Sequence, residues 1–208
     1  MPTIAEPVAR ETLGKQAAKS KHTQDNIINA VIVLIKEGGF AAASSSKIAQ
    51  KAGVSWGAVQ HHFGSKHEIL EAIMLRSQQH FTATLNAEQF YTGTLGQRVD
   101  RFVDTAWAHY QGAEYMAALE ILLATRAQQE QSSAMSIEKN QAQAQLHLWR
   151  SIFPEATNSD EQLLDDIQIV HCMLIGATIQ RVLESQSLEA GNYLRRVKQI
   201  LLALLTEK

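Results

Sequence analysis

The sequence is poor in cysteine and has no long apolar run. Cys172 is the one cysteine among 208 residues. A single thiol cannot form an internal disulfide and is weak evidence for a metal site or a secreted scaffold, so buried apolar packing is its expected role. The chain contains no run of about 18 uncharged apolar residues and no signal segment with a basic start and a cleavage site. The sequence therefore predicts a soluble, cytoplasmic protein.

Proline is also scarce, and the three prolines leave a long stretch uninterrupted. With proline only at Pro2, Pro7 and Pro154, nothing forbids helix between residues 8 and 153. No internal repeat or low-complexity tract is present. We therefore expect an all-α protein of about nine helices, in which a small amino-terminal domain precedes a larger helical bundle.

The chain has little net charge, −2 at pH 7, but its charge is unevenly distributed. Residues 1–66 contain 8 Lys+Arg against 4 Asp+Glu, whereas residues 67–208 contain 11 against 17. Binding to phosphate depends on local rather than total charge. The basic end is therefore the candidate nucleic-acid end, although such a split also arises by chance in two-domain proteins.

The apolar spacing divides the chain into an arm and two helical domains. Residues 1–21 have no apolar period and are predicted to be a flexible basic arm, with Arg10, Lys15, Lys19 and Lys21 as its cations. Residues 22–68 are expected to form a helix-turn-helix domain of three helices, and residues 69–208 the second domain. Further helices are predicted near 99–110, 115–126, 128–153, 159–186 and 190–206.

Two short helices joined by a tight corner are predicted over residues 45–63, after a first helix at 23–37. The serines at 44–46 offer side-chain oxygens to the first amides of one short helix, which ends at Gly53. Val54 can fill the corner, and Ser55 can cap the next helix, from Trp56 to His62. This unit matches the arrangement in which a second helix enters the major groove of DNA.

The same region carries a specific string of residues, and a capping box of Ser65 and Glu68 is predicted to open the fourth helix after it. The string is Gly39-Phe40, Ile48-Ala49, Ala52-Gly53-Val54-Ser55, Gly57, Val59, His62-Phe63, Ser65-Lys66 and Ile69-Leu70. Over about residues 23–75 the chain resembles the TetR family of bacterial transcriptional regulators. The resemblance implies a dimer that binds a palindromic DNA operator, represses transcription, and is released by a small-molecule effector.

Outward positions of the third helix are the candidate readers of base edges. Glutamine can pair with adenine and a methyl side chain can contact a thymine methyl, which gives these roles to Gln60 and Ala58. Gly57 either lets the backbone approach DNA closely or is simply a permissive early-helix residue. The predicted base-facing residues are Trp56, Gly57, Ala58, Gln60 and His61.

Phosphate contacts are expected from hydroxyl and basic groups around this helix. They come from Ser45 or Ser46 at the start of the second helix, from His62, and from Lys66 at the start of the fourth. Many family members have tyrosine where this chain has Gln60 followed by two histidines, so a tyrosine–phosphate contact is not carried over. The arm can add DNA contacts, although a solvated tail is the favoured interpretation.

A dimer surface is expected near the carboxyl end, because a palindromic site is read by two copies. Residues 169–179 are apolar nearly all round, so this helix must be covered on more than one side. In the TetR family the last two helices of each protomer form a four-helix interface, which fits this pattern. The predicted dimer residues are Val170, Leu174, Gly176, Tyr193, Val197, Ile200, Leu201 and Leu204.

The resemblance also implies an effector pocket in the second domain, where an apolar cavity with a few polar groups would suit a small molecule. Each candidate can equally be ordinary core, and Glu120 can pair with Arg126 or with solvent instead of a ligand. The candidates are Trp107, Tyr110, Tyr115, Met116, Glu120, Leu123, His147, His171 and Cys172.

Two rival functions have weaker support. A helical-bundle enzyme would need histidines and carboxylates at metal-binding spacing, but neither a repeated Glu-x-x-His nor a His-Glu-x-x-His motif occurs. His171 and Cys172 are adjacent and would point about 100° apart on a helix, which disfavours a metal sensor. We therefore expect no cofactor, no metal and no catalytic activity. A DNA-binding regulator that takes no ligand stays an open alternative.

Overall fold

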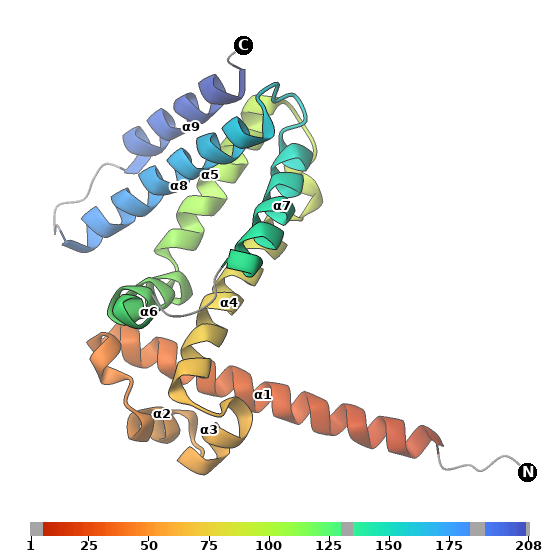
Figure 1. Ribbon diagram of the computed structural model, residues 1–208, viewed down its shortest axis with the longest axis vertical. Coiled ribbons are helices and arrows are strands. Elements are labelled where there is room, and N and C mark those ends of the chain that lie inside the picture. The colour runs from red at the N-terminus through yellow and green to blue at the C-terminus, as the bar shows by residue number, and fades with distance from the viewer. Residues whose placement is uncertain (1–5, 130–134, 184–189, 207–208) are drawn as a thin grey trace, which may run out of the picture. The chain divides into compact units, whose positions relative to one another are not determined.

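The computed structural model describes residues 6–129, 135–183 and 190–206, with side chains described for residues 16–125, 143–183 and 191–206. Within these ranges every regular element is helical, which confirms the predicted all-α class (Figure 1). The elements are α1 (Glu6–Gly38), η1 (Phe40–Ala42), α2 (Ser45–Ala52), α3 (Trp56–Phe63), α4 (Lys66–Leu85), η2 (Glu88–Phe90), α5 (Leu95–Gln111), α6 (Ala113–Gln129), α7 (Met135–Ile152), α8 (Asp160–Leu183) and α9 (Ala190–Thr206). None of these helices is both long and apolar enough to span a membrane.

α1 begins well before the first helix predicted from apolar spacing. That spacing starts at Ile27, whereas α1 begins at Glu6. The intervening residues contain alanine, lysine and glutamine, which favour helix even without an apolar face. Pro7 lies in the first turn, where a missing N–H removes no helical hydrogen bond. The segment predicted as a flexible arm is therefore helical from residue 6, and residues 1–5 lie outside the described part of the chain.

One compact unit consists of residues 1–77 together with residues 113–127. Its core combines buried apolar side chains of α1 to α4 with Ala117 and Ile121 of α6. The Glu120 carboxylate, also on α6, accepts the backbone N–H of Phe40 at 3.0 Å. This unit is therefore discontinuous in sequence, and α6 is one of its structural helices.

Arg76 joins three helices of this first unit. The guanidinium lies on α4, donates to the Asn29 side-chain oxygen on α1 at 2.9 Å, and donates to Glu114 on α6. The Asp25 carboxylate of α1 lies 3.8 Å from it. Because Arg76 is mostly buried, these contacts satisfy its charge inside the unit.

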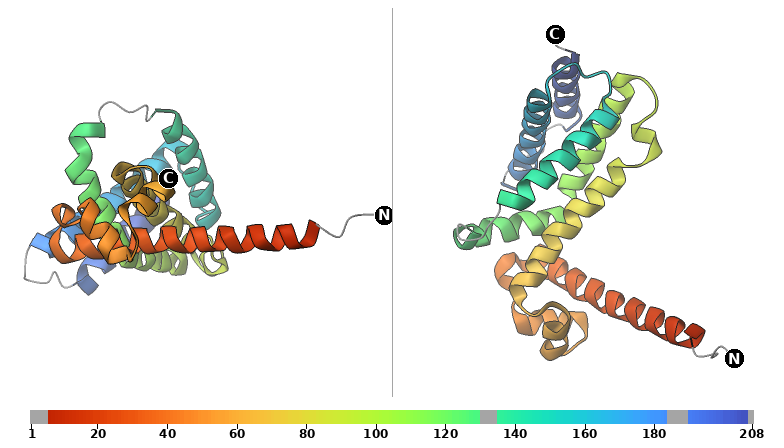
Figure 2. Two further views of the ribbon diagram at one scale, coloured as in Figure 1. Left: turned by 90° about the horizontal axis from the view of Figure 1, so that it is seen from below. Right: turned by 45° about the vertical axis from the view of Figure 1, so that its right-hand side comes forward.

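The second compact unit consists of residues 78–112 and 128–208. α5, α8 and α9 pack against one another, and α8 and α9 lie side by side in both Figure 1 and the right-hand view of Figure 2. Phe102 of α5 lies edge-on to Trp149 and Phe153, at ring-centroid distances of 5.0 and 5.8 Å. Buried Arg98 donates to the backbone oxygen of Ile152 at 2.7 Å, which fixes the start of α5 against the end of α7.

Candidate nucleic-acid interface

The corner between α2 and α3 is formed by three consecutive residues. Gly53 has φ 68° and ψ 28°, a left-handed conformation that favours glycine. Its N–H donates to Gln50 O at 3.2 Å, and Ser55 Oγ accepts the Ala58 N–H at 3.2 Å to open α3. Val54, between them, packs against the core. The unit of two short helices predicted at residues 45–63 is therefore present.

α3 has one buried side and one exposed side. Val59 is fully buried and anchors the helix in the core of its unit. Gly57, Gln60 and His61 are exposed. Trp56, predicted to face DNA, is partly buried and packs against the core, because it stands in the first turn beside the corner. Ala58, also predicted as a reader, is partly buried.

The serine hydroxyls at the start of α2 form no side-chain cap at the N-cap position, contrary to the predicted capping. Ser44 is the N-cap residue, but its side chain accepts no hydrogen bond from the described backbone amides at the start of α2. Its Oγ lies instead 3.3 Å from Ser46 Oγ. Ser46 is exposed and Ser45 partly buried, so the predicted phosphate-binding hydroxyls lie at the amino end of a helix whose first amides have no side-chain partner.

His62 and His61, adjacent on α3, have different surroundings. Gln24 of α1 donates to the His62 backbone oxygen at 3.4 Å, and Ser20 Oγ lies 3.5 Å from His62 Nδ1. His61 is exposed. The predicted phosphate ligand His62 therefore also connects the end of α3 to α1.

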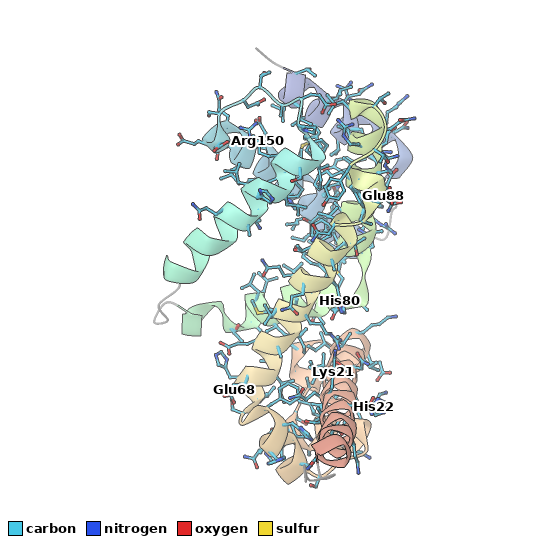
Figure 3. All side chains as sticks on the ribbon, turned by 90° about the vertical axis from the view of Figure 1, so that its right-hand side faces the viewer. Lys21, His22, Glu68, His80, Glu88 and Arg150 are labelled. Carbon is cyan, nitrogen blue, oxygen red and sulfur yellow. The ribbon has the colours of Figure 1, made fainter. Side chains whose placement is uncertain are left out.

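Lys66 stands at the first position of α4 and its ammonium lies over the Phe40 ring, 4.8 Å from the centroid. Partial burial lowers its pKa. Only half of the predicted capping box forms: Ser65 Oγ accepts the Glu68 N–H at 3.3 Å, while the Ser65 N–H donates to Phe63 O at 2.9 Å. Figure 3 labels Glu68 at this start of α4.

The helix-turn-helix region matches a known family. A family model described as bacterial regulatory proteins, tetR family, matches residues 27–73. The uncharacterized HTH-type transcriptional regulator TtgW of Pseudomonas putida is 37% identical over 91 residues, which cover 41% of this chain and 67% of TtgW. The chain belongs to the TetR family.

Other relatives of this TetR-family chain match over a smaller share of their length. The regulator BetI of Vibrio campbellii is 32% identical over 44% of this chain and 47% of BetI. SrpR of Pseudomonas putida is 36% identical over 41% of this chain and 42% of SrpR. The chain therefore matches less than half the length of these two relatives.

Solved structures share the fold at low sequence identity. A transcriptional regulator from Rhodococcus has a TM-score of 0.62 at 16% identity, covering 88% of this chain and 93% of its own. The TetR-family regulator PfmR of Thermus thermophilus has a TM-score of 0.57 at 18% identity, covering 88% and 99%. The multidrug binding protein EbrR, solved with imidazole, has a TM-score of 0.59 at 15% identity, covering 88% and 90%.

The predicted effector residues of this TetR-family chain fall in both compact units. Glu120 is engaged with the Phe40 N–H, and burial raises the pKa of Tyr115 to about 12. Leu123, His147 and Cys172 are exposed. The first unit holds Tyr115, Met116, Glu120 and Leu123, and the second holds Trp107, Tyr110, His147, His171 and Cys172.

His171 lies within a cluster of rings in the second unit. The Tyr110 hydroxyl and His171 Nδ1 share a hydrogen bond, and Phe81 lies edge-on to His171 at 6.2 Å. Desolvation, with a smaller contribution from His109, lowers the pKa of His171 to about 4. The sequence-based list omitted Phe81 and Trp149, whose ring is 5.9 Å from His171. Phe81 lies eight residues after Ile73 and seven after Met74, a helical spacing that could have revealed it.

The predicted dimer residues divide between the protomer's own core and its surface. Val170, Leu174, Val197 and Leu201 are fully buried in the protomer, whereas Gly176 is exposed and the remaining three, Tyr193, Ile200 and Leu204, are partly buried. α8 has a second apolar face, which we call the outer stripe: Ile169, Cys172, Gly176, Ile179 and Leu183, all exposed at spacings of three or four residues. Apolar periodicity indicated that α8 is apolar on two sides, but it did not show which side is buried within the protomer and which is exposed.

Proposed function

We propose that this protein is a DNA-binding transcriptional regulator that places α3 in the major groove of a palindromic operator. The observation that carries the proposal is the exposure of Gly57, Gln60 and His61 on a helix whose other side is anchored by Val59. A helix fits a groove about 12 Å wide, and such a helix presents its side chains to base edges. Membership of the TetR family supports the same role.

Selection of bound duplexes from random DNA tests this proposal directly. We expect enrichment of a palindrome whose half-site centres lie roughly 34–36 Å apart or at a multiple of that spacing, as a two-fold symmetric protein requires. No enrichment over random competitor at moderate salt, with candidate effectors absent, would show that the proposed function is wrong.

Gly57→Ala tests whether the α3 backbone approaches DNA closely. A Cβ at this position would meet only Ser55 Oγ at 3.8 Å, an ordinary contact within the protein. Alanine favours helix over glycine by up to about 1 kcal/mol, so the melting temperature should hold or rise. Operator affinity in gel shifts should fall by about tenfold, because the added methyl group would stand between backbone and DNA.

Gly96→Ala is the matched control for this substitution. Gly96 lies in the first turn of α5, where an added Cβ has no neighbour within 4 Å. The control should raise stability similarly and leave operator affinity unchanged. If Gly57→Ala also leaves affinity unchanged, Gly57 is a permissive helix residue and makes no close approach.

Gln60→Ala and Lys66→Gln should weaken binding in different ways. Removing Gln60 should relax base preference at one position of each half-site, by about 1–3 kcal/mol of discrimination. Removing the Lys66 charge should weaken binding to all sequences alike. It should also reduce the slope of log affinity against log salt concentration by about one for each protomer. Affinities for single-base operator variants at several salt concentrations separate the two patterns, and identical patterns would contradict these assigned roles. Thermal unfolding checks that loss of the Lys66–Phe40 contact leaves the fold intact.

We further propose a homodimer formed through the outer stripe of α8. Its exposed residues Ile169, Ile179 and Leu183 would be covered by a second copy. Gly176 would allow a helix of that copy to approach closely, because the space around its Cα is open: an added Cβ would have no neighbour within 4 Å. The partly buried Tyr193, Ile200 and Leu204 of α9 would border this contact. Two copies of α3 would then read the two half-sites.

Release of DNA by a small-molecule effector is the final element of the proposal, with repression as the output. The paired Tyr110 and His171 among aromatic rings would offer polar contacts in apolar surroundings. The fold shared with the multidrug binding protein EbrR supports this role. A thermal-shift screen followed by gel shifts tests it: a stabilising compound should also release the operator, and a protein that binds DNA but no compound would be a regulator without a ligand.

A further inference from the structure

α1 continues well past the point at which it contacts α3. That contact is made by Ser20 and Gln24, which meet His62 at the end of α3. The helix extends from there to Glu6, 14 residues farther, or about 20 Å at 1.5 Å per residue. Figure 1 and the right-hand view of Figure 2 both show the amino-terminal half of α1 running clear of α2 and α3.

This extension is basic close to α3. Residues 16–24 contain Lys19, Lys21 and His22 and no carboxylate, and these three side chains are exposed. Among the described side chains, neither lysine has an ion-pair partner. Figure 3 labels Lys21 and His22 on α1, in a view along that helix. Farther out, the sequence adds Arg10 and Lys15 against Glu6 and Glu11.

We infer that the amino-terminal part of α1 is a second DNA-binding surface, in which Lys19 and Lys21 bind phosphates of the duplex flanking the half-site read by α3. The inference rests on the proposed function, because α3 brings the duplex to this side of the unit. Charge complementarity and direct continuity with the end of α3 favour DNA as the occupant.

The length of the extension sets the reach of this surface. About 20 Å corresponds to at most about six base pairs at 3.4 Å per step, if the helix follows the duplex. Each protomer of a dimer would contact its own flank. The protected region should therefore extend beyond both half-sites by up to this distance.

An anionic membrane is the competing occupant for a basic helix. Membrane-surface helices carry large apolar residues such as Trp, Phe and Leu on one face. Residues 6–24 contain no Phe, Trp or Tyr, and their only larger aliphatic residues are Val8 and Leu13. This composition favours a phosphate backbone over a lipid surface.

The test compares the full-length protein on two duplexes that carry the selected palindrome, one ending at the half-sites and one extended by ten base pairs at each end. Each phosphate contact adds about 0.9 to the slope of log affinity against log salt. Two lysines on each of two protomers should therefore raise the wild-type slope by about 3.6 on the long duplex. Lys19→Gln/Lys21→Gln should remove this increase while leaving binding to the short duplex unchanged.

Lys36→Gln is the control for this double substitution, because Lys36 is an exposed lysine near the other end of α1. It should leave the flank-dependent increase intact. If the wild-type protein selects a palindrome but its salt slope does not depend on flank length, the inference is wrong and the proposed function stands. If the double variant loses affinity equally on both duplexes, the lysines lie within the half-site. If it loses affinity only for phosphatidylserine vesicles, the surface binds a membrane. Either result overturns the inference. If wild type selects no sequence at all, the proposed function itself fails.

Discussion

Ile179→Glu is expected to produce folded monomers whose operator affinity is lower by about 100-fold, because a monomer reads a single half-site. Ile179 lies in the outer stripe of α8 and is 37% exposed, so a carboxylate there can remain in water in the isolated protomer. At an interface with a second copy the same carboxylate would be buried without a partner, which is strongly unfavourable. Sedimentation velocity measures the assembly state, and gel shifts measure the affinity.

Two further substitutions make this result specific. Leu75→Glu introduces the same charge at an apolar residue of α4 that is 52% exposed, and it should leave the dimer intact. Leu174→Glu places the charge on the inward face of α8, where the side chain is fully buried, and it should unfold the protomer instead of merely separating two copies. A dimeric, fully active Ile179→Glu protein would show that the outer stripe is not the interface.

Acidification is expected to destabilise the protein through His171. Its folded-state pKa is about 4, below the ordinary value of 6.5, because burial disfavours the charged ring. Above pH 6.5 both folded and unfolded states hold neutral imidazole, so the shift has no effect. Between pH 6.5 and pH 4 the unfolded state takes up the proton first, and stability therefore falls as the pH falls. The expected loss from this residue is about 2 kcal/mol between pH 7 and pH 5.

His171→Gln removes this titration while keeping an acceptor for the Tyr110 hydroxyl. Urea unfolding at pH 5, 6 and 7 should show a weaker pH dependence for the variant than for wild type. His147→Gln is the control, since His147 is an exposed histidine in the same unit, and it should leave the wild-type pH dependence unchanged. Equal pH dependence of stability in wild type and His171→Gln would show that the pKa of His171 is not lowered by folding.

Local signals in the sequence were sufficient to predict the helix-turn-helix. Gly53 can adopt a left-handed conformation and Ser55 can accept an amide hydrogen bond regardless of what packs nearby, so both helix ends follow from chain chemistry alone. The early start of α1 was not predicted, because helix propensity without an apolar period gives a weak signal.

Features that depend on packing between distant segments were beyond the sequence. Nothing in the spacing of Ala117 and Ile121 reveals that they complete a core with α1 rather than with α5. Glu120 was predicted from the sequence to contact a ligand. In the structure its carboxylate accepts a hydrogen bond from the Phe40 N–H, a partner 80 residues away. Helical periodicity finds an apolar face but does not reveal what covers it, and for this reason the predicted dimer set combined Leu174, which is buried within the protomer, with the exposed Gly176.

The contribution of α6 to the first unit limits how parts of this protein can be exchanged with relatives. A hybrid that takes only residues 1–77 from one regulator would place a foreign helix against Phe40 and Arg76, whose partners Glu120 and Glu114 come from residues 113–127. Transplanting operator specificity therefore requires two separate cassettes, the second taken from the middle of the chain, or else a graft confined to the exposed positions of α3.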